Sequence, residues 1–277
     1  NDSIDVILTD PPYLYLKGQK LEREFDERQF FFQCKRVLKD SGFIVLFGRG
    51  TSFYRWNTIL SDLGFVFKEE IVWDKLMNTN PVLPISRMHE TVSIHSKCTA
   101  KINKVKREFV EANKYDPQKI AEAIYRLTTT FGNRKTFELV KKYFETGEYA
   151  FDEGKEREFD TTIRKDILKP NRTLNFAITM EEGVVERSIM KEVRNHYCAI
   201  HPTQKPVRLL ARLLALVIPQ DKPREEITVL DPFGGSFSSM EAVYNLNING
   251  ISYEIDEEYF NAGQKRINEI QSQQKLF

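Results

Sequence analysis

The residues best suited to chemistry lie near the start of the chain, where a strand-like run ends in an acid, two prolines and an aromatic ring. The apolar run at residues 6–8 predicts a buried strand, which ends at Asp10, Pro11, Pro12 and Tyr13. Each proline ring holds φ at about −65° and leaves no backbone N–H, so the turn is stiff and its carbonyl oxygens face no competing donor. This combination is suited to binding a planar base by its amino group. The alternative is an ordinary proline-rich turn in which Asp10 caps a neighbouring amide.

A second turn of related design lies near the other end of the chain. The apolar run 228–230 leads into residues 231–236, an Asp-Pro turn with two adjacent glycines, and a helical pattern follows. Adjacent glycines let the backbone approach a ligand closely, and the start of a helix offers unpaired N–H groups. Another strand-like run ends at Glu254, about twenty residues beyond the glycines, which is the spacing at which dinucleotide-binding folds place an acid on a ribose.

Three motifs follow one another in the chain: 10–13 (Asp-Pro-Pro-Tyr), 201–206 (His-Pro-Thr-Gln-Lys-Pro) and 231–236 (Asp-Pro-Phe-Gly-Gly-Ser). In this order they resemble the amino-methylating DNA methyltransferases of the β group, whose catalytic motif precedes the cofactor motif. The resemblance covers residues 1–99 and 196–270. It implies an enzyme that transfers a methyl group from S-adenosylmethionine to the exocyclic amino group of a base flipped out of double-stranded DNA, as in restriction-modification systems.

The first motif fits the needs of an aromatic amine. Its lone pair is delocalised into the ring, so the amine is a poor nucleophile until its two hydrogens are accepted by other groups. We expect the carboxylate of Asp10 and the carbonyl of Pro11 to accept them, with Pro12 keeping the turn stiff and Tyr13 stacking on the base. Flipping the base out of the duplex costs a few kcal/mol, which stacking and pocket contacts offset.

The second half of the chain carries the cofactor-binding set that the resemblance implies. In the family, the 201–206 segment lines the methionine end of the cofactor, and Lys205 is well placed to meet a carboxylate. The alternative is a capped helix with an incidental charge, in which Thr203 is the cap and Pro206 lies in the first turn. No metal site is expected. The expected cofactor-binding residues are Asp231, Pro232, Phe233, Gly234, Gly235, Ser236, Glu254, His201, Thr203 and Lys205.

Outside the motifs, the hydrophobic periodicity alternates between strand and helix. After the first strand come a helix from about residue 25, a strand at 43–47, a second helix and a strand at 65–73. This rhythm predicts an α/β fold with a Rossmann-like doubly wound mixed sheet, as the resemblance implies for a class I S-adenosylmethionine-dependent methyltransferase. Arg49 and Lys75 lie at strand ends near the expected active edge, where either is a phosphate contact or an ordinary surface charge.

The strand–helix rhythm stops near Lys97, and three regions are expected: 1–99 and 196–277 as the catalytic and cofactor-binding halves, and 100–195 as a mainly helical insertion. Two helices around a turn at 131–133 are typical of a DNA-reading helix-turn-helix or of a plain helical hairpin. The insertion lies where β-group enzymes hold target recognition. Its densest basic cluster would suit phosphate contacts and consists of Lys101, Lys104, Lys106 and Arg107.

The composition is that of a globular protein with an ample core. No apolar run approaches membrane-spanning length, and there is no signal-peptide pattern at the start. The three cysteines are scattered, which favours a reducing, cytoplasmic location, and the net charge of +1 neither supports nor excludes nucleic acid. Family members usually supply a cofactor-side acid from an earlier segment, so we expect native residues to precede Asn1. β-group enzymes are often dimers, but no apolar stripe identifies an interface with a second copy or a partner subunit.

The resemblance favours adenine N6 as the methyl acceptor. Members whose motif begins with Asp are mostly adenine enzymes, whereas Ser is more usual in N4-cytosine enzymes, which remain the alternative. The sequence is also compatible with a catalytically silent DNA-binding subunit of a methyltransferase complex, or with an enzyme that acts on RNA or a free nucleobase. The intact motif at 10–13 argues against a silent subunit, and the long insertion argues against a small free substrate.

Overall fold

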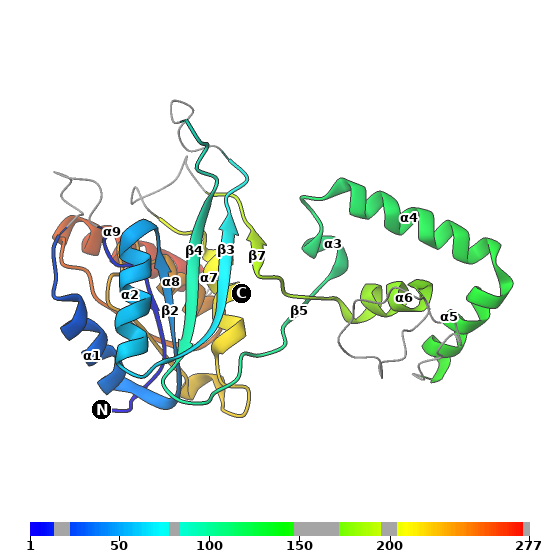
Figure 1. Ribbon diagram of the computed structural model, residues 1–277. Helices are drawn as coiled ribbons and strands as arrows, with labels where there is room; N and C mark the ends of the chain where they lie inside the picture. Colours follow the sequence, from blue (N-terminus) through cyan, green and yellow to red (C-terminus); the bar gives the residue numbers. More distant parts are fainter. Residues whose placement is uncertain (14–22, 78–83, 147–171, 195–203, 274–277) are drawn as a thin grey trace. The chain divides into compact units, whose positions relative to one another are not determined.

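The computed structural model shows a chain that divides into two compact units (Figure 1). Unit 1 contains Asn1–Lys104 and Arg187–Phe277, and unit 2 contains Val105–Glu186. Unit 1 is therefore assembled from two segments that are remote in the sequence. The residues described by the structure are 1–13, 23–77, 84–146, 172–194 and 204–273.

Unit 1 is built on a seven-stranded mixed sheet. Within it, β4 is antiparallel to both of its neighbours, β2 and β3, whereas the other pairings are parallel. The carboxyl ends of the parallel strands and the amino end of β4 therefore meet at one edge of the sheet, called the carboxyl edge below. In spatial order the strands are β7 (Ile189–Lys191), β3 (Val66–Asp74), β4 (His89–Ser96), β2 (Leu38–Gly48), β1 (Ile4–Thr9), β8 (Thr228–Asp231) and β9 (Asn249–Ser252).

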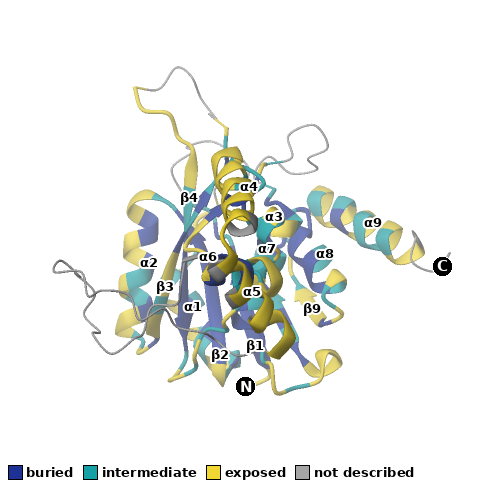
Figure 2. Ribbon diagram, turned by 90° about the vertical axis from the view of Figure 1, so that its right-hand side faces the viewer, coloured by how far each residue is buried: buried dark blue, intermediate teal, exposed yellow. Residues whose placement is uncertain are grey.

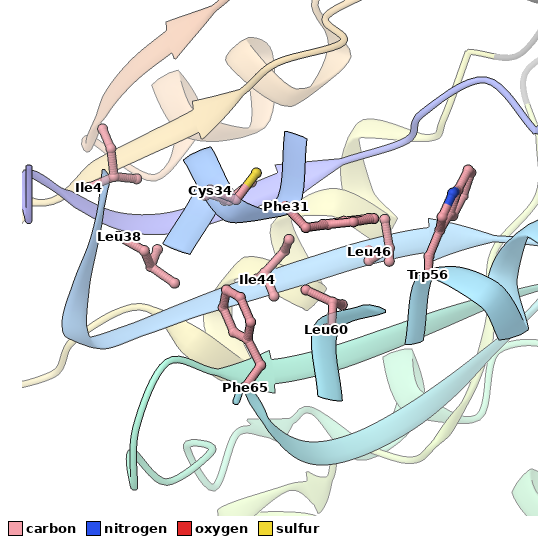
Figure 3. Close-up of a cluster of buried hydrophobic side chains, with 10 residues drawn as sticks. Ile4, Phe31, Cys34, Leu38, Ile44, Leu46, Trp56, Leu60 and Phe65 are labelled. Atoms are coloured by element: carbon pink, nitrogen blue, oxygen red, sulfur yellow. The ribbon is translucent and has the colours of Figure 1, made fainter. Parts of the chain in front are cut away.

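Two helices, α1 (Glu27–Val37) and α2 (Gly50–Asp62), pack on one face of this sheet. Asp26 caps α1 by accepting a hydrogen bond from the N–H of Gln29 at 2.9 Å. Figure 3 shows side chains from both helices converging on β2. This core fixes β1 and β2 and so positions the turn that follows β1. Its members are Ile4, Ile7, Phe31, Cys34, Leu38, Ile44, Leu46, Trp56, Leu60 and Phe65.

On the other side of β1 and β2 lies α7 (Val207–Val217), which contacts both strands and buries six apolar side chains. The helix α8 (Ser238–Asn245) packs against α7, and α9 (Glu257–Gln273) contacts α8. A 3-10 helix, η1 (Arg224–Glu226), precedes β8. With helices on both faces, the central strands are buried (Figure 2), and the predicted doubly wound mixed sheet is confirmed.

Unit 2 contains α4 (Pro117–Gly132) and α5 (Arg134–Thr146), the two helices that the sequence predicts around residues 131–133. The carboxylate of Asp116 accepts a hydrogen bond from the N–H of Lys119 at 3.3 Å, as an N-cap residue does at the start of a helix. The other elements of unit 2 are β5 (Lys106–Arg107), α3 (Phe109–Ala112), α6 (Arg172–Glu182) and β6 (Val184–Val185).

The basic cluster at the start of the insertion is divided between the two units. Lys106 forms an ion pair with Glu182, and Arg107 lies 3.2 Å from a carboxylate oxygen of Glu111. These two cations are thus paired with acids within unit 2, and the phosphate contacts expected of the cluster stay a prediction. Lys101 and Lys104 are exposed and belong to unit 1. No helix in the described ranges is both long and apolar enough to cross a membrane.

Candidate active site

The two remote turns that the sequence singles out lie side by side at the carboxyl edge. The strands β1 and β8 are parallel neighbours, with Ile7 opposite Leu230. Asp10 follows β1 directly and Asp231 is the last residue of β8, so both carboxylates lie at the same edge of the sheet. The two turns therefore meet at this edge, and a group held by one turn can face a group held by the other.

The first turn is stabilised by contacts among its own residues and with α2. The hydroxyl of Tyr13 donates a hydrogen bond to Asp10 Oδ1 at 2.5 Å, and the Ser52 hydroxyl donates one to the Tyr13 carbonyl at 2.6 Å. The Tyr13 ring lies 6.0 Å from the ring of the buried Trp56, centroid to centroid. Pro11 is buried and Pro12 is half-buried. The turn thus presents a carboxylate and an aromatic ring from a rigid base.

Lys205 joins the first turn from the segment just before α7. Its ammonium group forms an ion pair with Asp10 Oδ2, and it lies 3.3 Å from Glu90 Oε2 and 5.1 Å from the centroid of the Phe47 ring. Burial alone would lower the pKa of this ammonium, but the charges of Asp10 and Glu90 outweigh burial and raise the pKa above its ordinary value. Lys205 therefore remains a cation, and its charge faces the Asp10 carboxylate.

Two further charges at this edge, Glu90 and Lys75, were not assigned to the site from sequence. Glu90 is the second residue of β4, and Lys75 follows β3; their side chains form an ion pair with 2.5 Å between Nζ and Oε1. Burial would raise the pKa of Glu90, but Lys205 and Lys75 together lower it to about 2. Burial lowers the pKa of Lys75, in part against the attraction of Glu90. Since Lys75 is only 3% exposed, the phosphate contact considered from sequence is wrong.

The second turn brings a carboxylate and backbone N–H groups together. Gly235 donates its N–H to Glu254 Oε2 at 2.7 Å, and the N–H of Asp256 reaches Glu254 Oε1 at 2.8 Å. Asp231 accepts hydrogen bonds from the Ser239 hydroxyl at 2.5 Å and from the N–H of Phe233 at 3.1 Å. Burial, aided by the negative charges of Asp10 and Glu254, raises the pKa of Asp231 to about 7 in spite of these bonds.

Close packing explains why this turn requires glycine. A Cβ added to Gly234 would lie 2.2 Å from Ser252 Oγ and 2.7 Å from the Phe237 ring. Gly235 has a φ of +53°, in the left-handed region that glycine adopts without steric cost. Ser252 Oγ is buried and, within the described part of the chain, has no hydrogen-bond partner. A spare acceptor beside a glycine turn is a feature expected of a small-molecule site.

The other predicted cofactor-binding residues differ in whether they lie in the second turn. Ser236 is buried, with its hydroxyl 3.0 Å from that of Ser238, and Pro232 lies in the same turn. Phe233 packs on Phe25 at a ring-centroid distance of 5.3 Å, so much of it is structural. His201 and Thr203 lie outside the described residues. The helix α7 begins at Val207 with Pro206 as its N-cap, so the expectation that Thr203 caps it and that Pro206 lies in its first turn is wrong.

The start of α7 follows from proline stereochemistry. Pro206 has the extended ψ of 127°, and a proline also disfavours helical geometry in the residue before it. Lys205 is therefore held outside the helix, where its side chain turns toward Asp10. Among the described residues, no group of three or more His, Cys, Asp or Glu side chains is placed to hold a metal ion.

Comparison with known families shows which family the chain belongs to. The model of the N6/N4 family described as DNA methylase matches residues 4–265 of the chain. The chain belongs to this family. The chain is 26% identical to the type II methyltransferase M.HinfI of Haemophilus influenzae over 297 residues, which cover 98% of this chain and 64% of M.HinfI. It thus spans less than two thirds of that relative.

Other comparisons agree with this membership. The chain is 23% identical to the type II methyltransferase M.HpaI of Haemophilus parainfluenzae over 280 residues, covering 96% of this chain and 69% of M.HpaI. Its fold resembles that of M1.HpyAVI, solved as a complex with SAM, with a TM-score of 0.51 at 19% identity, covering 95% of this chain and 88% of that one. PvuII DNA methyltransferase (cytosine-N4-specific) gives 0.53 at 14% identity, with 95% and 79% covered. The predicted class I methyltransferase fold is confirmed.

Proposed function

We propose that this DNA methylase transfers a methyl group from S-adenosylmethionine to the exocyclic amino group of a base in double-stranded DNA. The observation that carries the proposal is the adjacency of the Asp10 and Asp231 turns on neighbouring parallel strands. An amine held by the first turn then faces a methyl donor held by the second. The relatives named type II methyltransferases support a role as the modification enzyme of a restriction-modification system.

The first turn would activate the amine. The base leaves the duplex, and the Asp10 carboxylate and the Pro11 carbonyl accept its two amino hydrogens, which localises the nitrogen lone pair for attack. Tyr13 stacks on the ring of the base. Because Tyr13 donates its hydroxyl to Asp10 Oδ1 at 2.5 Å, that oxygen becomes available to the amine when the tyrosine turns to the base.

The second turn would hold the cofactor, and its residues fit that role. The Gly234 backbone packs closely on Ser252 and Phe237. The buried Ser252 hydroxyl has an unused hydrogen-bonding capacity within the described residues, and Glu254 offers a carboxylate for ribose hydroxyls. S-Adenosylmethionine brings a methyl group already activated by its positively charged sulfur, so the protein mainly aligns donor and acceptor. The solved complex of M1.HpyAVI with SAM, on the same fold, supports this choice of cofactor.

Adenine N6 is the base position that we favour, because the motif at 10–13 begins with Asp. N4-cytosine is the second candidate, since PvuII DNA methyltransferase, named as cytosine-N4-specific, shares the fold. We assign target recognition to residues 100–195, which lie between the catalytic and cofactor-binding halves as in the β group.

One experiment tests the activity and the base together. The purified chain is incubated with S-adenosylmethionine and amplified, unmodified genomic DNA, which is then digested to nucleosides and measured by mass spectrometry. We expect N6-methyldeoxyadenosine. Detection of N4-methyldeoxycytidine instead would assign cytosine rather than adenine as the target base, and the type of reaction would be unchanged. Neither product, from a folded chain that binds the cofactor, would reject the enzyme in favour of a silent subunit.

A further inference from the structure

Lys205 lies between two carboxylates, of which only Asp10 belongs to the proposed catalytic motif. It forms an ion pair with Asp10 Oδ2 and lies 3.3 Å from Glu90 Oε2. The lysine is buried, with only 8% of its surface exposed, so water offers its charge little stabilisation. A buried cation of this kind requires a carboxylate partner at every stage of a reaction.

Methyl transfer would change the demands on Asp10. In the structure, Oδ1 accepts the Tyr13 hydroxyl and Oδ2 is paired with Lys205. When Asp10 accepts an amino hydrogen from a base, part of its negative charge is drawn away from Lys205. The ammonium then needs a second acceptor close by, or it would move with Asp10 and pull the carboxylate out of line.

Glu90 has the capacity to be that second acceptor. Its Oε1 is occupied by Lys75 at 2.5 Å, whereas Oε2 is buried and receives no well-formed hydrogen bond from the described residues. That oxygen faces Lys205 and already forms an ion pair with it at 3.3 Å, a contact that can shorten into a hydrogen bond. The carboxylate stays ionised because two lysines flank it, and its position is fixed because β4 begins at the carboxyl edge between β2 and β3.

We propose that Glu90 is a positioning residue for methyl transfer, which holds Lys205 in place while Asp10 turns to the amino group of the base. Lys75 in turn fixes Glu90. The inference rests on the proposed function, and it adds two residues, from β4 and the end of β3, that touch neither the base nor the cofactor. They act only through Lys205 and Asp10.

The test compares Glu90→Gln with a matched control, Asp5→Asn. Asp5 is another buried carboxylate held by two lysines, Lys39 and Lys222, each 2.9 Å away, but it lies at the opposite end of β1 from Asp10. Both substitutions remove one charge and keep the side-chain shape. Asp5→Asn leaves Lys39 and Lys222 without this acid, whereas Glu90→Gln leaves Lys75 without it and Lys205 with Asp10 alone. Methyl transfer to amplified genomic DNA is measured with both substrates saturating, alongside the cofactor dissociation constant and the melting temperature.

We expect Glu90→Gln to lower kcat by about 10- to 100-fold, the scale of a misplacement of roughly 1 Å, with the cofactor dissociation constant changed by less than about twofold. Glu90→Asp, which retains the charge, should recover part of the loss. Lys75→Met should lower kcat as well, and the Lys75→Met/Glu90→Gln double variant should be no slower than Glu90→Gln alone, because both act through one lysine. Asp5→Asn should lower the melting temperature but leave kcat within about twofold.

Each other result has a definite meaning. A Glu90→Gln enzyme with normal kcat, or one in which only cofactor affinity falls, overturns the inference. So does an equal loss of kcat in Glu90→Gln and Asp5→Asn, because the role of Glu90 would then be merely structural. If Glu90→Gln does not fold, Glu90→Asp and Lys75→Met decide by the same criteria. A wild-type chain that transfers no methyl group rejects the proposed function instead, before the variants are compared.

Discussion

The ammonium group of Lys205 pairs with the carboxylate of Asp10, although 195 positions separate the two residues in the chain. The pairing joins the segment that precedes α7 to the turn that follows β1, and so couples the two halves of unit 1 at the point where the chemistry is proposed. From sequence, Lys205 belonged to the cofactor-binding set. The geometry instead supports a role in orienting the Asp10 carboxylate.

Replacing Lys205 by Met should therefore impair the chemical step rather than cofactor binding. The variant keeps the apolar stem over Phe47 and removes the charge that faces Asp10. We expect kcat at saturating cofactor to fall by about 100-fold. Isothermal titration should give a cofactor dissociation constant within about threefold of the wild-type value. A large loss of cofactor affinity with a normal kcat would return Lys205 to the cofactor site.

The raised pKa of Asp231 predicts a pH-dependent stability of the cofactor-free protein. An acid whose pKa is raised by folding stabilises the folded state at low pH, and this contribution is lost as the pH rises through about 7. Asp231→Asn cannot ionise. Its melting temperature, minus that of the wild type, should therefore increase between pH 5 and pH 8, as measured by differential scanning fluorimetry without cofactor. A difference that stays constant over this range would contradict the raised pKa.

The glycine turn predicts a local packing defect with a matched control. Gly234→Ala places a Cβ 2.2 Å from Ser252 Oγ, so the turn must shift; we expect a loss of about 1–3 kcal/mol in the free energy of unfolding, with weaker cofactor binding. Gly132→Ala adds a Cβ that meets no described atom within 4 Å, and should change stability by less than about 0.5 kcal/mol. Urea denaturation compares the two, and equal effects would refute the close packing.

Asp5 predicts the opposite dependence on pH. Burial would raise its pKa, but the N–H of Thr228 and the two lysines outweigh it and lower the pKa. A carboxylate with a lowered pKa stabilises the fold above its unfolded pKa, and this contribution is lost as the pH falls through the folded value. Asp5→Asn should cost about 1–3 kcal/mol at pH 7 and progressively less below pH 4. Thermal unfolding across this range is the measurement, and an equal loss at both ends would exclude the ion pairs as the cause.

The strand tips were predictable from sequence, and the charges around them were not. Asp10 and Asp231 each end an apolar strand with a proline turn, and neighbouring parallel strands bring such turns to one edge whatever lies between them. Glu90 gives no such signal, because its place depends on β4 running antiparallel between β2 and β3. An acid at the start of a strand reaches the carboxyl edge only in that topology.

The same limit explains why the sequence did not reveal the burial of Lys75. Lys75 directly follows a strand, which is also where a surface phosphate contact would lie, and its partner Glu90 comes from the next strand by a pairing that the sequence does not reveal. The sequence placed a helix after the 201–206 motif, where α7 lies, but with the wrong first residue. Thr203 was expected to be its cap and Pro206 to lie in its first turn, whereas Pro206 is the cap. Charge partners and helix ends depend on tertiary contacts more than on periodicity.

The measurement that tests the central claim most directly is single-turnover methyl transfer by Asp10→Ala. Enzyme in excess over unmodified DNA is mixed with S-adenosylmethionine carrying a labelled methyl group, and the label incorporated into DNA is counted over time. If Asp10 activates the amine, Asp10→Ala should bind the cofactor with an affinity within about threefold of wild type, while the transfer rate falls by at least about 1,000-fold. An Asp10→Ala variant that transfers the label at the wild-type rate would contradict the catalytic role of Asp10.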